Sequence, residues 1–273
     1  MNKIIFRLKD KAGMSILEVL VALFLAGIVT AAIFQIYITQ HKNWMIQEDI
    51  TDIQQNARAA IDELNRNIRM AGYGLPSGMI PIMAYDTNPD TIIINFSRTR
   101  CSAPLEEAMP MPSSELKCDG NDISCFHDGD WVYICHPGTG DGEYFEINEV
   151  QVAAAHILHN TMPLSKVYNK GAAVVQLDRI KYYIDYSDSL HPNLMMQASL
   201  QSPQVYAENI YDLQFRYTMK NGTTTDAPVI SSNIREVEIS LSARSSKPDL
   251  DFPDNPYRRR TYSSKVNLRN LDI

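Results

Sequence analysis

Apolar and polar positions divide the chain into parts with different patterns. Residues 14–38 are apolar at almost every position, and Glu18 is the one charged residue among them. A helix of about 20 apolar residues is long enough to cross the hydrocarbon core of a bilayer. The sequence therefore predicts a transmembrane helix over residues 14–38, preceded by a short segment, residues 1–13, that carries four basic residues.

The next part, residues 39–72, has the three-and-four spacing of an amphipathic helix. Its apolar stripe consists of Ile50, Ile53, Ala57, Ile61, Leu64 and Ile68. On the other face Asp62 and Arg66 are spaced for an i,i+4 ion pair, and Gly72 and Gly74 are expected to end the helix. Because the stripe lacks sustained heptads, we expect it to pack on the protein's own sheet rather than in a coiled coil.

Residues 73–273 predict a β-rich head. Apolar and polar residues alternate most clearly over 180–186, 210–217 and 234–243, which is typical of strands with one buried face. The expected strands cover residues 91–96, 130–135, 143–152, 172–186, 210–217, 234–243 and 262–268. The predicted fold class is α+β, a long amino-terminal helix packed on an antiparallel β-sheet head.

Composition and charge narrow the classes of function. The chain has 273 residues and a formal net charge of −7. A mean hydropathy of −0.22 excludes a polytopic membrane protein, and an acidic pI near 5.4 argues against a nucleic-acid binder. No Ser/His/Asp arrangement, glycine-rich phosphate loop or close carboxylate pair stands out in the sequence, so we expect no enzyme activity.

Glu18 gives the amino terminus its most specific feature. A carboxylate in a lipid-facing helix is unfavourable unless it is neutralised or paired, so its default interpretation is functional. The alternative places Glu18 near the interface, where it reaches water. The basic residues before the apolar run predict that residues 1–13 stay in the cytoplasm and that the chain beyond residue 38 lies outside.

The order Gly13, Met14, Glu18 resembles the processing signature of type IV prepilins. The resemblance implies cleavage between Gly13 and Met14 by a prepilin peptidase that also methylates the new amino terminus. It further implies that Glu18 neutralises that amine, on a neighbouring subunit, during assembly. Met14 and Ser15 depart mildly from the family, which usually has Phe and often Thr at these positions.

A narrower resemblance covers residues 54–74, QQNARAAIDELNRNIRMAGYG. It is similar to the helix end of PilW-type minor pilins, which are related to the larger pseudopilins of type II secretion. The family implies a pilin-like fold and storage in the inner membrane with the head in the periplasm, followed by transfer to a pilus. The implied partners are other major and minor pilins, the prepilin peptidase and the pilus assembly platform. A minor pseudopilin, a membrane-tethered adhesin and an anchored enzyme are the alternatives.

The four cysteines, Cys101, Cys118, Cys125 and Cys135, lie in one region of the head. A location outside the cytoplasm permits disulfides. Of the three possible connectivities, Cys101 to Cys118 with Cys125 to Cys135 closes the smallest loops, and we favour it. A zinc site that also uses His127 and His136 is the weaker hypothesis, because no compact CxxC spacing is present.

Two further groups of charged residues are weak candidates for binding. The first is an oxygen-rich cluster next to the cysteines that could hold calcium; it consists of Asp119, Asn121, Asp122, Asp128 and Asp130. Its order does not match an EF-hand loop, so turn-forming residues on a solvated loop are favoured. The second is the triplet 258–260, RRR, for which pairing with Asp249, Asp251 and Asp254 is simpler than phosphate contact. Asn221 and Gly222 predict a hairpin turn.

Overall fold

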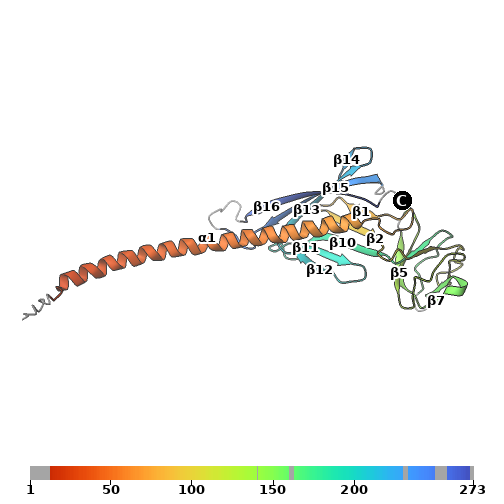
Figure 1. The fold of residues 1–273 in the computed structure, drawn as a ribbon, viewed down its shortest axis with the longest axis horizontal. Coiled ribbons are helices and arrows are strands. Elements are labelled where there is room, and N and C mark those ends of the chain that lie inside the picture. The colour runs from red at the N-terminus through yellow and green to blue at the C-terminus, as the bar shows by residue number, and fades with distance from the viewer. Residues whose placement is uncertain (1–12, 140, 160–162, 230–232, 250–256, 271–273) are drawn as a thin grey trace, which may run out of the picture. The chain divides into compact units, whose positions relative to one another are not determined.

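The computed structural model describes residues 13–139, 141–159, 163–229, 233–249 and 257–270. The chain forms two compact units, residues 1–49 and residues 50–273. The helix α1 (Ile16–Met70) belongs to both, and among the described residues it is the one helix long and apolar enough to cross a membrane. The expected α+β fold, one long amino-terminal helix with antiparallel sheets, is confirmed (Figure 1).

The last five turns of α1 pack through the predicted apolar stripe. Ile53, Ala57, Ile61, Leu64 and Ile68 are buried, and Ile50 is half-buried. The helix ends at Met70, and the following glycines, Gly72 and Gly74, have positive φ angles of 80° and 67°. Glycine adopts this conformation without the steric cost that a Cβ imposes, so the predicted helix end is confirmed.

The predicted pairing of Arg66 with Asp62 was wrong. Arg66 pairs with Glu63, three residues before it. The Glu63 side chain is only 14 % exposed and also accepts a hydrogen bond of 2.8 Å from Asn67 Nδ2. Because Glu63 is fixed and partly withdrawn from water, it is a better partner for a guanidinium than the exposed Asp62.

Two antiparallel sheets and residues 50–70 of α1 share one core. The first sheet, in the order β1-β2-β10-β11-β12, consists of β1 (Ile82–Tyr85), β2 (Thr91–Phe96), β10 (Asp178–Asp185), β11 (Asn193–Ala198) and β12 (Gln204–Ala207). The second, in the order β14-β13-β15-β16, consists of β14 (Thr224–Thr225), β13 (Ile210–Met219), β15 (Ile234–Arg244) and β16 (Arg259–Asn267). We call this part, residues 50–96 and 178–270, the helix-sheet body.

Asp90 links the two sheets of the body. Its backbone N–H donates to the carbonyl of Leu213 at 2.8 Å, and its carboxylate accepts from the Phe215 N–H at 2.7 Å. Both partners lie on β13, so Asp90 in the loop before β2 pairs with backbone hydrogen-bonding groups at the edge of that strand. Burial is the main cause that raises the pKa of the Asp90 carboxyl above its usual value.

A second lobe is inserted between two neighbouring strands of the body. Phe96 at the end of β2 lies opposite Asp178 at the start of β10, so the intervening chain leaves and re-enters the sheet at one place. Residues 101–177, which we call the insert lobe, have a separate hydrophobic core. In Figure 1 this lobe contains the green strands β5 and β7.

The insert lobe contains two small antiparallel sheets and a short 3-10 helix. One sheet, in the order β3-β9-β5-β6, consists of β3 (Ser102–Pro104), β9 (Ala173–Val175), β5 (Trp131–Cys135) and β6 (Gly142–Glu146). The other, in the order β4-β8-β7, consists of β4 (Leu116–Lys117), β8 (His156–Leu158) and β7 (Glu149–Gln151). The 3-10 helix is η1 (Val152–Ala154).

Two predicted strands were wrong because each is split between different sheets. Residues 143–152 form β6, β7 and the start of η1, because the Ile147 N–H donates to Asp130 O and the Asn148 N–H donates to Leu158 O. Residues 172–186 form β9 in the insert lobe and β10 in the body. Between them the Gln176 N–H donates to Cys101 O at 3.0 Å, which turns the chain out of one sheet and into the other.

Arg179 on β10 connects the lobe to the body. Its guanidinium lies 4.8 Å from the ring centroid of Tyr133 in the lobe, and its Nε donates to the buried Asn95 Oδ1 at 2.9 Å. Tyr144 of the lobe is within hydrogen-bond distance, 3.1 Å, of Ser199 Oγ in the body. Buried polar groups that are fully paired restrict the ways in which two packed parts can fit together.

Candidate functional site

The amino-terminal end of α1 is closed by a reciprocal pair of side-chain contacts. Glu18 Oε2 accepts a hydrogen bond of 2.9 Å from the backbone N–H of Ser15. In return Ser15 Oγ accepts one of 3.3 Å from the Glu18 N–H. Since α1 begins at Ile16, Ser15 is the N-cap and Glu18 the third helical residue, so the two form a capping box. The carboxylate of Glu18 is therefore folded back over the first turn, where the helix dipole favours a negative charge.

The predicted cleavage position directly precedes this box. Gly13 and Met14 are exposed and lie before the first helical residue. Among the described residues, a Cβ placed on Gly13 would meet no atom within 4 Å, so no contact there requires a glycine. A peptidase needs an unfolded, accessible peptide bond, and the 13–14 bond is outside the helix.

The first turns of α1 expose a continuous apolar surface. Along the whole predicted membrane segment, the large apolar side chains are each more than two-fifths exposed; examples are Ile16, Leu23, Phe24, Ile33 and Ile38. An apolar surface of this extent is unfavourable in water and marks a contact with lipid or with another chain. The segment therefore has the surface of a membrane helix and of a helix that joins an assembly.

Comparison with known proteins supports the same interpretation of the amino terminus. The model of the prokaryotic N-terminal methylation motif matches residues 8–34, which include Gly13, Met14 and Glu18. Over these residues the chain resembles the amino terminus of type IV prepilins. The matched residues support a pilin or a pseudopilin.

No curated protein matches this chain. Among solved structures, a type IV-like pilin from Thermus thermophilus has a TM-score of 0.38 and 10 % sequence identity. The match covers 80 % of this chain and 97 % of that one.

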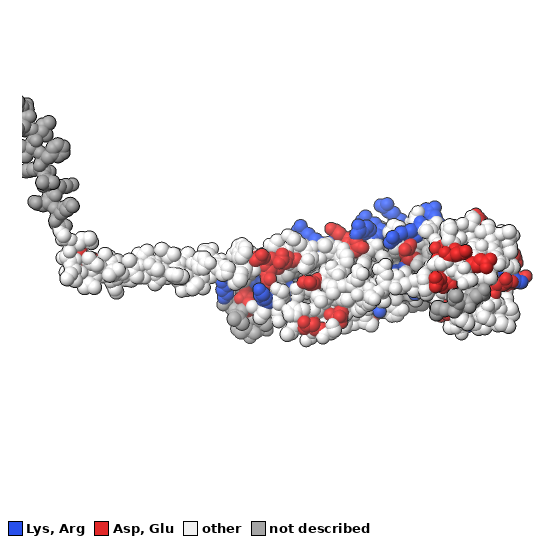
Figure 2. Space-filling model, turned by 90° about the horizontal axis from the view of Figure 1, so that it is seen from below, with Lys and Arg blue, Asp and Glu red and all other residues white. Residues whose placement is uncertain are grey.

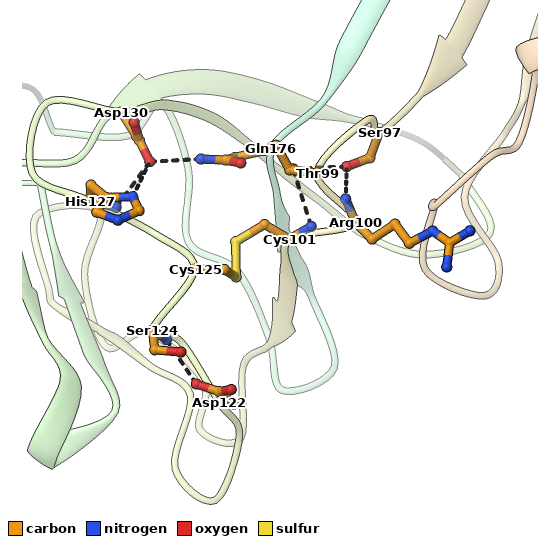
Figure 3. The surroundings of a disulfide bond; sticks show 10 residues. All are labelled: Ser97, Thr99, Arg100, Cys101, Asp122, Ser124, Cys125, His127, Asp130 and Gln176. Atoms are coloured by element: carbon orange, nitrogen blue, oxygen red, sulfur yellow. Dashed lines mark hydrogen bonds and ion pairs between the residues drawn. A yellow bond between two sulfur atoms is a disulfide. The ribbon is translucent and has the colours of Figure 1, made fainter.

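In the head, the predicted disulfide pairing was wrong. The structure has one disulfide, Cys101–Cys125, while Cys118 and Cys135 are free and buried. Cys101 and Cys118 belong to the core of the insert lobe and Cys135 to a small cluster beside the body, whereas Cys125 is exposed. The shortest loops in the sequence therefore did not identify the partners, because folding brings Cys125 rather than Cys118 to the sulfur of Cys101 (Figure 3).

The two free thiols are unsuited to redox chemistry. Burial raises the pKa of Cys118 to about 12 and that of Cys135 to about 11. The thiolate is the reactive form of cysteine, so raised values make both groups unreactive at neutral pH. Both thiols are buried, and at Cys135 the effect of burial on the pKa outweighs the opposing effect of the Arg179 charge.

The calcium candidates act as supports of the lobe's loops. Asp122 Oδ1 accepts from the Ser124 N–H at 2.9 Å, and Asp128 Oδ1 accepts from the Val150 N–H at 2.8 Å. Asp130 Oδ2 accepts from the His127 N–H and from Gln176 Nε2, as Figure 3 shows. Asp119 Oδ1 lies 3.3 Å from His156 Nε2, and Asn121 Nδ2 donates to Cys118 O.

The described residues include no group of three or more His, Cys, Asp or Glu side chains arranged to hold a metal ion. His136, a candidate for the zinc hypothesis, packs instead with its ring centroid 5.2 Å from that of Tyr168.

The turn predicted at Asn221 and Gly222 is confirmed, since Gly222 has a φ of 84° and its N–H donates to Met219 O.

The predicted internal pairing of the arginine triplet is confirmed at one position. Arg258 Nη2 lies 2.7 Å from Asp249 Oδ2, and the Asp249 side chain is buried. Asp251 and Asp254 lie outside the described residues. Arg259 stacks on the ring of Tyr211.

The sequence reasoning missed one residue of the amino-terminal site. Ser15 was treated as a departure from the usual family residue, whereas in the structure it is the N-cap partner of Glu18. The signal was present, because Ser-x-x-Glu before an apolar run is the pattern of a capping box. This motif gives Glu18 a structural role besides the proposed one in charge pairing.

Proposed function

We propose that the chain is a minor type IV pilin. In this proposal it is stored in the inner membrane as a prepilin with its head in the periplasm, cut between Gly13 and Met14, methylated, and incorporated into a pilus. The observation that carries the proposal is the lone carboxylate of Glu18 in an apolar helix, five residues after a glycine and within a matched methylation motif.

The charge at Glu18 supplies the reason for assembly in register. Cleavage creates a positive amine at Met14, and both this amine and the carboxylate are unfavourable in a medium of low dielectric constant. Pairing the two charges across neighbouring subunits removes most of that cost. The pairing also selects the axial position of each incoming helix, because only one offset brings the two groups together.

The insert lobe supports a priming or tip role over that of the main repeating subunit. It adds a second core and two sheets to a head that already has a complete core. A uniform filament repeats one set of head contacts, and an added lobe of this size disturbs such a repeat. At the tip or at a rare position one side of the head stays free, so the added lobe is tolerated and available for contact with other pilins or a surface. A minor pseudopilin of a type II secretion system shares these requirements.

The first test is the intact mass of the chain extracted from membranes. We expect the loss of residues 1–13 and the gain of one methyl group on Met14. Gly13→Leu should block this change, whereas Gly27→Leu, at a glycine within α1 where an added Cβ would meet no atom within 4 Å, should not. A wild-type chain that stays uncut would refute the proposal in favour of a plain membrane-tethered protein.

The second test separates the charge of Glu18 from its role in the cap. Both Glu and Gln complete a capping box, so Glu18→Gln removes the charge and keeps the cap, while Ser15→Ala keeps the charge and removes the cap. We expect the Glu18→Gln chain to be processed but absent from sheared pili, and the Ser15→Ala chain to be incorporated. Normal incorporation of Glu18→Gln would contradict the charge-pair mechanism.

A further inference from the structure

Two arginines on adjacent strands of the body lie side by side at one end of the second sheet. Arg244 on β15 is directly opposite Arg259 on β16, and directly opposite residues project from the same face of a sheet. Buried residues of β15 such as Leu241 and Ala243 face the core, so Arg244 and Arg259 belong to the outer face. Like charges in this position repel each other.

Aromatic contacts hold both guanidinium groups at that face. The Arg244 Cζ lies 4.5 Å from the ring centroid of Tyr257, and the Arg259 Cζ lies 4.9 Å from that of Tyr211. Tyr211 is on β13, so Arg259 reaches across β15 to its ring. Arg244 Nη2 also donates to the carbonyl of Ser189 at 2.8 Å. The two side chains are thus positioned, rather than left to diverge into solvent.

No carboxylate of the described residues forms an ion pair with either arginine, although other cations of this region have acidic partners. Arg258 is paired with Asp249, and Lys265, on the same face of β16, lies 3.6 Å from Glu238 and 3.8 Å from Glu236. The nearest acid by strand register, Asp212 opposite Ser242, accepts a hydrogen bond from Gln214 Nε2. Within the part of the chain that the structure describes, the cross-strand repulsion is therefore left without a paired carboxylate.

Hydroxyl groups adjoin the arginine pair on the same face. Ser242 and Thr261 occupy the next row of that face, with Ser242 Oγ and Thr261 Oγ1 2.8 Å apart. The long-range field does not oppose an anion here, because the insert lobe accounts for the acidity of the chain. Residues 101–177 contain 3 Lys and 11 Asp and Glu, 3 − 11 = −8, whereas the helix-sheet body contains 15 Lys and Arg and 16 Asp and Glu, 15 − 16 = −1.

We propose that Arg244 and Arg259 form a binding site for a phosphate group. Guanidinium groups are planar donors that bind phosphate oxygens in pairs, and two of them in cross-strand register present such donors to one tetrahedral anion. The bound phosphate supplies the counter-charge that the described residues do not, beside the row of the sheet that carries Ser242 and Thr261. The phosphate can come from a free phosphate ion or from the phosphodiester headgroup of a lipid. This site does not depend on the proposed pilin function.

The test is a titration of the full chain in neutral detergent, followed by ³¹P NMR at constant ionic strength. One arm uses inorganic phosphate and the other uses glycerophosphoglycerol, the soluble deacylated headgroup of phosphatidylglycerol. We expect a saturable change in the ³¹P signal with the wild type in at least one arm, and at least a tenfold weaker apparent affinity with Arg259→Gln. Tighter binding of phosphate identifies a free anion as the ligand, and tighter binding of the diester identifies a lipid headgroup.

Lys265→Gln is the matched control, because it removes one positive charge from the same strand face while leaving the arginine pair intact. It should bind within about twofold of the wild type. Arg244→Gln provides a second disruption on the other strand, and thermal unfolding checks that each variant is folded. An unsaturable signal with the wild type, or affinities of Arg259→Gln and Arg244→Gln equal to that of the wild type, would overturn the proposal.

Discussion

Breaking the Cys101–Cys125 disulfide should destabilise the insert lobe by a predictable amount. The bond joins residues separated by 24 positions. In the chain-entropy treatment, a cross-link that closes a loop of this length lowers the free energy of folding by about 3.5 kcal/mol, because it restricts the unfolded chain. The bond connects the start of the lobe, directly before β3, to the loop that follows β4 along the chain. Its loss therefore frees the segment between the two cysteines.

Urea unfolding of the full chain in detergent measures this loss. The sequence contains two tryptophans, Trp44 on α1 and Trp131 on β5 of the insert lobe. A Trp44→Phe background therefore leaves one fluorescence reporter, and it lies in the lobe of interest. We expect Cys125→Ala and the double variant Cys101→Ala/Cys125→Ala to lose the same stability, since removing either partner opens the same loop.

Thiol counting on the wild type checks the pairing itself. Unfolded without reductant, the chain should react with two equivalents of iodoacetamide, at Cys118 and Cys135; folded, it should react with neither, because both thiols are buried. A cross-linked peptide that contains Cys118, or a stability loss below about 1 kcal/mol in both variants, would refute the reasoning.

Two further predictions concern the helix-sheet body. Burial raises the pKa of Asp90, so the folded state binds the carboxyl proton more tightly than the unfolded state does. Ionisation of this group therefore lowers the free energy of unfolding as pH rises from its unfolded pKa of about 4 through its raised folded pKa. The unfolding free energy of Asp90→Asn minus that of the wild type should therefore increase over this interval in pH-dependent urea titrations; an unchanged difference would show that Asp90 does not titrate there. Leu64 is fully buried between α1 and the sheets, so Leu64→Ala should lower the unfolding free energy by about 2–5 kcal/mol. Asp62→Ala, at an exposed position of the same helix, should be close to neutral, and an equal loss in both variants would mean that the apolar stripe does not hold the helix.

Features that depend on local periodicity were accessible from the sequence. The stripe from Ile53 to Ile68 identified the buried face of α1, and strict alternation identified β13 and β15 nearly to their ends. Each of these patterns reports which side of one element is buried, and this is decided within a few residues. Gly13 and Glu18 were found in the same way, since the signal is a fixed local spacing in an apolar background.

Features that depend on a choice of partner were decided by the tertiary structure. The spacing of Cys101, Cys118 and Cys125 permits several bonds, and only the folded lobe brings one pair within bonding distance. Arg66 had two acidic neighbours at helical spacing, and the partial burial of Glu63 selected between them. The run 172–186 contains one continuous strand signal, yet its halves enter different sheets because β2 and β10 adjoin and the insert lobe departs between them. Sequence patterns describe the environment of each side chain, whereas contacts between distant segments follow from how whole elements pack.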